Sequence, residues 1–188
     1  MLEQFREMKQ LIIGLGNPGR EFCFTPHNLG FRFLNQLQKT WRFPPFQLEK
    51  SLRSQLTRGK IKEIDIILAK PQTFMNNSGI AVRRLQKKFS FLPEDIWVVH
   101  DDLDLPWGTF KIAQDRGSAG HKGVASIIQA LNSQSFNRLR LGIKPADPLQ
   151  DGGEYVLQKL RFRQRTAARR TINQAIPQLE QRLIMEKE

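Results

Sequence analysis

The chain has 188 residues, of which 39% are hydrophobic, with 13 Phe and 3 Trp among them. This length predicts one domain, residues 1–188, with a substantial buried core, and the composition excludes a disordered chain. Thirty Lys and Arg against 18 Asp and Glu give a formal net charge of +12, which favours anionic partners, with nucleic acid first among them.

The sequence carries no signal of export or of membrane insertion. No apolar run approaches the ~18 residues that a membrane span needs, so we expect no membrane partner. The charged N-terminal leader, residues 1–9, lacks the apolar stretch of a signal peptide. The single cysteine, Cys23, excludes an internal disulfide. Between Phe22 and Phe24 we expect a buried, inert thiol, and we predict a cytoplasmic protein.

Hydrophobic periodicity predicts strands that alternate with helices. Short apolar runs predict buried strands at 11–13, 64–69 and 96–99, and weaker patterns predict strands at 108–113 and, half-buried, at 138–143. Helical spacing predicts helices from Pro26 to Leu37, over 79–91 and 124–131, and in a basic tail, 161–188, where Pro177 breaks or starts a segment. The alternation predicts an α/β fold, a single domain with a central mixed, largely parallel β-sheet flanked by helices.

A glycine-rich turn follows the first predicted strand, with the sequence Gly14-Leu15-Gly16-Asn17-Pro18-Gly19. Its glycine spacing matches the dinucleotide-binding fingerprint, in which the glycines lead directly into a helix. Here Pro18 removes an amide donor, and the helix begins only near Pro26. We therefore expect no nucleotide cofactor. The turn either only reverses the chain or presents the side chain of Asn17 to the crevice that lies beyond the strands of such sheets.

Three carboxylates and a histidine follow the strand at 96–99, in the sequence His100-Asp101-Asp102-Leu103-Asp104. Three interpretations are open: a metal site, since Asp and His ligate metal ions, a solvated acidic turn, or an Asp that orients a catalytic histidine. The candidate histidine is His27, at the start of the first predicted helix. A neutral imidazole that meets a carboxylate at one nitrogen can deprotonate water with the other.

Two further loops offer polar groups. Segment 70–79 follows a predicted strand and contains Asn76 and Asn77, whose amides suit a polar substrate or cap the next helix. Segment 117–123 is rich in glycine, and its amides and Lys122 either meet a phosphate or form an ordinary turn. The chain lacks the G-x-S-x-G turn of a serine nucleophile.

Together, these segments resemble the bacterial peptidyl-tRNA hydrolase family. The ordered matches cover most of residues 11–155, and they are Gly14-Leu15-Gly16-Asn17-Pro18-Gly19, Thr25-Pro26-His27-Asn28-Leu29-Gly30, Lys70-Pro71-Gln72-Thr73-Phe74-Met75-Asn76-Asn77-Ser78-Gly79, His100-Asp101-Asp102-Leu103-Asp104-Leu105-Pro106, Gly120-His121-Lys122-Gly123 and Arg138-Leu139-Arg140-Leu141-Gly142-Ile143. The resemblance implies a monomeric α/β enzyme that hydrolyses the ester between a peptide and the 3′-terminal ribose of tRNA. It implies no metal and no organic cofactor, and it makes peptidyl-tRNA, bound through its acceptor stem and 3′ end, the partner.

The resemblance also implies roles for the matching side chains. His27 corresponds to the catalytic base, Asp101 to the acid that orients it, and Asn17 to the residue that recognises the peptide amide of the substrate. Arg140 corresponds to a basic residue that meets the tRNA 5′-phosphate. The other positions in contact with substrate are Phe22, Phe74, Asn76 and Lys122, and we expect Asn76 to help to stabilise the oxyanion.

The chain departs from the family pattern at four positions. Phe22 replaces Tyr, Pro26 replaces the Arg before the histidine, Ala113 replaces a basic phosphate contact, and Lys122 replaces the Asn of Gly-His-Asn-Gly.

Two alternative functions from other classes stay open. One is a tRNA- or RNA-binding module that has lost catalysis, which Lys122 favours. The other is a metal-dependent phosphoesterase built on residues 101–104.

Overall fold

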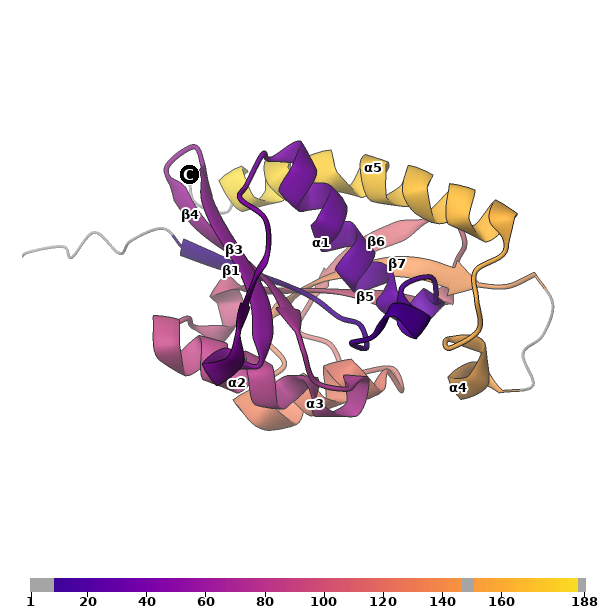
Figure 1. The fold of residues 1–188 in the computed structure, drawn as a ribbon, viewed down its shortest axis with the longest axis horizontal. Helices are drawn as coiled ribbons and strands as arrows, with labels where there is room; N and C mark the ends of the chain where they lie inside the picture. The colour runs from indigo at the N-terminus through magenta and orange to yellow at the C-terminus, as the bar shows by residue number, and fades with distance from the viewer. Residues whose placement is uncertain (1–8, 147–150, 186–188) are drawn as a thin grey trace, which may run out of the picture.

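The computed structural model describes residues 9–146 and 151–185. These residues form a seven-stranded sheet in the order β2-β3-β4-β1-β5-β7-β6, with helices on both faces (Figure 1). The strands are β1 (Lys9–Gly14), β2 (Gln47–Glu49), β3 (Ser54–Ile61), β4 (Ile64–Pro71), β5 (Ile96–Pro106), β6 (Phe110–Gln114) and β7 (Asn137–Lys144). The α-helices are α1 (Leu29–Thr40), α2 (Ser78–Phe89), α3 (Lys122–Leu131), α4 (Gly152–Tyr155) and α5 (Phe162–Met185).

The sheet has a parallel centre and antiparallel edges. Strand β1 pairs in parallel with β4 and β5, and β5 pairs in parallel with β7. The outer pairs, β2 with β3, β3 with β4 and β6 with β7, are antiparallel. The predicted α/β fold with a mixed, largely parallel sheet is therefore confirmed. Most of the predicted leader, 1–8, and the end of the predicted tail, 186–188, lie outside the described residues.

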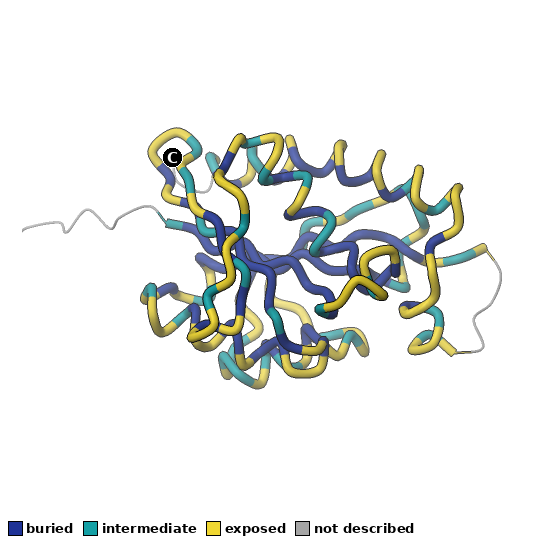
Figure 2. The backbone as a smooth tube through the Cα atoms, viewed as in Figure 1, coloured by how far each residue is buried: buried dark blue, intermediate teal, exposed yellow. Residues whose placement is uncertain are grey.

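Two hydrophobic cores lie on opposite faces of the sheet. Helices α1 and α5 cover one face, where Phe33 and Trp97 are fully buried, and α2 and α3 cover the other, where Val98 and Val124 are fully buried. Trp97 and Val98 are neighbours on β5 and enter different cores because successive strand residues point to opposite faces. Figure 2 shows the buried strands between two layers whose outer surfaces are exposed.

Helix α1 begins against the carboxyl end of β1 and the first half of β5. A Cβ at Gly30 would lie 2.3 Å from the Leu15 amide nitrogen and 2.4 Å from the Val99 carbonyl oxygen, so only glycine allows this approach. The approach places the turn before α1, which carries His27, beside the middle of β5, where Asp101 lies.

Three strand predictions need correction. Residues 47–61, where no strand was predicted, contain β2 and the whole of β3. Their polar side chains hid the pattern, because β3 pairs with β4 from Ser54 to Ile61 and needs no apolar run of its own. Strand β5 does not stop at Val99, since its pairing with β7 continues to Asp102. Strand β7 is buried from Asn137 to Ile143 rather than half-buried, because it lies between β5 and β6 and is covered on both faces.

Three local predictions also differ. The helix expected at Pro26 starts with a 3₁₀ turn, η2 (Pro26–Asn28), and α1 itself begins at Leu29. Helix α5 runs through Pro177, which lies on its exposed side, where the carbonyl that loses a partner can bind water. Cys23 is exposed rather than buried, because the loop that carries it runs over the surface. No described helix has the length and apolar character needed to cross a membrane.

Candidate active site

A cavity of about 520 Å³ opens at the edge of the sheet where β1 and β4 end, and residues 101–104 of β5 line it. The parallel centre of the sheet brings these strand ends together, as expected for α/β folds. Residues far apart in the sequence therefore share one site. Of the predicted site residues, those that line the cavity are Asn17, Phe22, His27, Phe74, Asn76, Asp101 and Lys122, whereas Arg140 does not.

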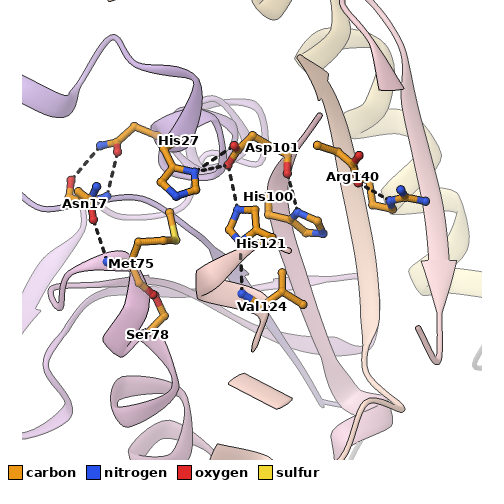
Figure 3. A network of polar contacts seen from close by, with 11 residues as sticks. Asn17, His27, Met75, Ser78, His100, Asp101, His121, Val124 and Arg140 are labelled. Carbon is orange, nitrogen blue, oxygen red and sulfur yellow. Dashed lines mark hydrogen bonds and ion pairs between the residues drawn. The ribbon is translucent and has the colours of Figure 1, made fainter. Parts of the chain in front are cut away.

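His27 and Asp101 line this cavity and are hydrogen-bonded to each other (Figure 3). The Nδ1 atom of His27 lies 3.1 Å and 3.0 Å from the two carboxylate oxygens of Asp101. Their exposed fractions are only 8% for His27 and 2% for Asp101. Because a carboxylate accepts, Nδ1 carries the proton and Nε2 keeps a lone pair. The described residues leave Nε2 unbonded, so it can accept a proton from a molecule in the cavity.

The pKa of Asp101 keeps it ionised. Burial by itself would raise this pKa, but the facing imidazoles of His27 and His121 and their hydrogen bonds outweigh burial and hold it below its usual range. Asp101 is therefore a permanent acceptor at neutral pH. A buried carboxylate of this kind fixes the tautomer of His27 and favours the imidazolium that forms when His27 takes a proton.

The backbone around His27 is held at several points. The His27 amide donates to the Val156 carbonyl oxygen over 3.0 Å. The next side chain, Asn28, accepts from the Asn17 amide at 2.8 Å and donates to the Asn17 carbonyl at 2.9 Å. This two-point contact fastens turn η2 to the glycine-rich turn after β1. Asn28 is a positioning residue that sequence reasoning missed, although it lies next to the candidate histidine.

The side chain of Asn17 has one fixed and one available end. Its Oδ1 accepts from the Met75 amide at 2.8 Å (Figure 3), which also settles which end is the oxygen, because a backbone N–H only donates. Its Nδ2 makes no hydrogen bond to the described residues. Asn17 therefore offers the cavity a donor, and a substrate group that it recognises must be an acceptor, such as a carbonyl oxygen.

His121 is a second partner of Asp101 that sequence reasoning did not single out. Its Nε2 lies 3.1 Å from Oδ1 of Asp101, and its Nδ1 accepts from the Val124 amide at 3.2 Å. The Val124 contact makes Nδ1 the unprotonated nitrogen, so Nε2–H donates to Asp101. His121 is also the N-cap of α3. Its place in the Gly-His-Lys-Gly segment was the available signal.

His100 lies behind Asp101 and does not face the cavity. Its Nδ1 is 2.7 Å from the Asp101 carbonyl oxygen, and its Nε2 is buried with no hydrogen-bond partner among the described residues. Burial, with the nearby His121, lowers the pKa of His100 to about 3. His100 is therefore neutral at physiological pH, and all three histidines of the chain gather around one aspartate.

The acidic cluster divides between two partners. Asp102 points away from Asp101 and its Oδ2 accepts from Arg140 Nε at 2.6 Å, while Arg140 Nη2 lies 3.9 Å from Asp104. Asp101 and Asp102 are buried, so the solvated acidic turn is wrong for both. Arg140 is itself only 8% exposed. The resemblance implied that Arg140 meets the tRNA 5′-phosphate, and in the structure its guanidinium is mostly buried against the carboxylate of Asp102.

The donor set of the cluster fits hydrogen bonding better than metal binding. His27, Asp101 and His121 each offer a ligand atom, and these atoms lie within 4.8 Å of one another. However, His121 Nε2 carries a proton because Nδ1 is occupied by the Val124 amide. It therefore has no lone pair for a cation, and His27 likewise directs its Nδ1 proton at Asp101.

Apolar and amide groups form the rest of the cavity wall. Phe74 is 59% exposed, and Asn76 and Lys122 are exposed at the rim. Val156 and Leu157, just after α4, also line the cavity. Sequence reasoning did not assign the α4 segment to the site, since neither its composition nor its spacing carries a chemical signal.

Comparison with known proteins places this geometry in a family. The peptidyl-tRNA hydrolase family model matches residues 11–187. A peptidyl-tRNA hydrolase of Hydrogenobaculum sp. is 41% identical over 169 residues, 89% of this chain and 87% of the relative. One of Koribacter versatilis is 44% identical over 154 residues, 81% and 75% of the two chains. The crystal structure of peptidyl-tRNA hydrolase from Acinetobacter baumannii superposes with a TM-score of 0.89 at 30% identity, covering 98% of this chain and 92% of that one. The chain therefore belongs to the peptidyl-tRNA hydrolase family.

Proposed function

We propose that this chain hydrolyses the ester bond between the peptide and the 3′-terminal ribose of peptidyl-tRNA, which returns tRNA to translation. The observation that carries the proposal is the buried His27–Asp101 pair, with an unbonded Nε2 at the base of an open cavity. Such a pair is suited to activate water. Membership of the family supplies the substrate class.

The first half of the reaction is attack by water. Asp101 holds the proton of His27 on Nδ1, so Nε2 takes a proton from a water molecule in the cavity. The water oxygen bonds to the ester carbonyl carbon, and the carbonyl electron pair moves onto oxygen. The Asn76 amide and neighbouring backbone N–H groups donate to this oxyanion. General base catalysis by His27 contributes about 10²–10⁴-fold.

The second half releases the products. The tetrahedral intermediate collapses, the carbonyl forms again and the bond from carbon to the ribose oxygen breaks. The imidazolium of His27 returns its proton to that oxygen, which leaves as the ribose hydroxyl, and the peptide leaves as a carboxylic acid. Asp101 stabilises the imidazolium between the two halves without itself taking the proton.

The cavity wall supports binding of the two parts of the substrate. Phe22, Phe74 and Leu157 form an apolar surface for the peptide. Asn17 donates from Nδ2 to a peptide carbonyl beside the ester. Lys122, at the rim, brings a positive charge to the 3′-terminal nucleotides.

The proposed enzyme works as a monomer in the cytoplasm and uses no metal. All residues of the proposed site come from one chain, so a partner copy is not needed to complete it. Its substrate forms where translation occurs. The hydrogen-bonded tautomer of His121 supports a reaction without a metal ion at this cluster. Size-exclusion chromatography with light scattering tests whether the protein is a monomer in solution.

The central test is release of N-acetyl amino acid from N-acetyl-aminoacyl-tRNA, with and without EDTA. We expect release by the parent, no effect of EDTA, and loss of at least a hundredfold in kcat for His27→Asn, with tRNA affinity changed less than threefold. Free aminoacyl-tRNA is the control substrate and should be hydrolysed poorly. Absence of release would favour an RNA-binding module, and release abolished by EDTA would favour a metal-dependent phosphoesterase.

A further inference from the structure

A second, basic cavity lies on the α1 and α5 side of the loop that precedes His27. It measures about 320 Å³, and its lining includes Arg32 and Lys39 of α1, Arg169 of α5, and Phe24 of the loop. None of its lining residues is acidic. The sequence around it has the same bias, since residues 156–179 contain no Asp or Glu. We call this set, together with Arg165, the basic pocket.

Phe24 organises the cations at the edge of the basic pocket. The guanidinium carbon of Arg165 lies 4.7 Å from the centre of the Phe24 ring, and that of Arg32 lies 5.4 Å from it. An aromatic ring attracts cations to its face, so Phe24 holds two arginines near each other although their charges repel. Burial and the charge of Arg165 both lower the pKa of Arg32. An anion bound between them would relieve this repulsion.

The hydrogen-bonding groups of the basic pocket are mainly donors. Arg32 Nη1 is buried and has no hydrogen-bond partner among the described residues. Asn35 uses its Oδ1 to accept from Lys70 Nζ at 2.8 Å, which leaves its Nδ2 to donate. A cluster of guanidinium and amide N–H groups suits a ligand with several anionic oxygens, such as a phosphate group, whose geometry the arginine fork matches.

We propose that the basic pocket binds the phosphodiester backbone of the tRNA substrate, away from its 3′ end. This inference rests on the function proposed above. The supporting placement is that Phe22 lines the active-site cavity, whereas Phe24, two residues later, lines the basic pocket. A nucleic acid whose 3′ end reaches His27 therefore has the basic pocket within its span. The pocket adds affinity for long RNA and takes no part in the chemistry.

The test compares variants inside and outside the basic pocket. Arg169→Ala and Lys39→Ala remove a charge from it. Arg163→Ala, on α5, and Lys87→Ala, on α2 at the opposite face of the sheet, remove the same charge from exposed positions that do not line it. Each variant is assayed with N-acetyl-aminoacyl-tRNA and with a short CCA-ended oligonucleotide that carries the same ester. Affinity for uncharged tRNA is measured from 50 to 200 mM salt.

We expect the pocket variants to raise KM for the full tRNA about threefold to tenfold, with kcat and the short substrate unaffected, as for lost uniform binding. The slope of log affinity against log salt should fall by about 1 for each pocket variant and by less for the controls. Any of three results would overturn the inference. KM for the full tRNA rises equally in pocket and control variants, or it rises in neither, or KM for the short substrate rises as much as that for the full tRNA. Failure of the parent to hydrolyse either ester would instead refute the proposed function, while the salt slopes would still decide whether the basic pocket contacts RNA.

Discussion

His121 and His27 donate to the same carboxylate, that of Asp101, and do so from opposite tautomers. His27 uses Nδ1 and His121 uses Nε2, each about 3.1 Å from Oδ1. The second donor restrains Asp101, and Asp101 in turn restrains His27. The rigidity of the base therefore depends on a residue that does not itself take the substrate proton.

Two substitutions of His121 separate its restraint of Asp101 from its role as the N-cap of α3. Serine at an N-cap accepts from the helix amide as His121 Nδ1 does, but it is too short to reach Asp101. We expect His121→Ser to lower kcat about tenfold with KM unchanged, and to keep most of the stability. His121→Ala should lose as much activity and about 1 kcal/mol more stability. If activity instead followed the melting temperature across both variants, His121 would be only structural.

The low pKa of His100 predicts acid sensitivity of the fold. Burial lowers this pKa to about 3, whereas an unfolded histidine titrates near 6.5. Between these values the unfolded chain binds the extra proton, so the free energy of unfolding falls as pH falls, by up to about 1.4 kcal/mol per pH unit. His100→Asn can still donate to the Asp101 carbonyl but cannot titrate. The free energy of unfolding, measured with urea at pH 6.5, 5.5 and 4.5, should change less with pH for this variant than for the parent. An identical pH dependence of the two would contradict the prediction.

Removal of Arg140 should act first on stability. Arg140 is buried and pairs with Asp102 at 2.6 Å, so Arg140→Ala leaves a buried carboxylate without its partner, at a cost of about 3–5 kcal/mol. The double variant with Asp102→Ala should recover part of that loss. Chemical denaturation measures both. A contact of Arg140 with the tRNA 5′-phosphate is tested separately, by the slope of log affinity for tRNA against log salt. Such a contact predicts that the variant reduces this slope by about 1, and an unchanged slope in a folded variant would exclude it.

Lys122 should contribute to affinity rather than to chemistry. It lies at the rim of the active-site cavity as the first residue of α3, where its ammonium can donate but not accept. We expect Lys122→Ala to raise KM severalfold with kcat nearly unchanged, and Lys122→Asn to stay active. A hundredfold rise in kcat for Lys122→Asn over a barely active parent would show instead that the natural lysine inactivates the site. Steady-state kinetics on N-acetyl-aminoacyl-tRNA distinguishes these outcomes.

Local patterns in the sequence were enough for the parts of the fold that depend on neighbouring residues. The apolar runs at 11–13, 64–69 and 96–99 became β1, β4 and β5, and the helical spacing near 79–91 and 124–131 became α2 and α3. Strand β3 was missed because its stability comes from pairing with β4 along its whole length. That pairing is a long-range property, and the polar side chains of β3 do not reveal it.

The sequence by itself also determined the residue types of the candidate site, since ordered motifs around His27, Asn17 and Asp101 identified a family. Only the tertiary structure decided how these residues meet. Asp101 and Asp102 are adjacent in the chain, yet one contacts His27 and the other contacts Arg140, because successive residues of a strand face opposite sides. The partners of the two side chains therefore depend on strand pairing and helix packing, which no local sequence pattern contains.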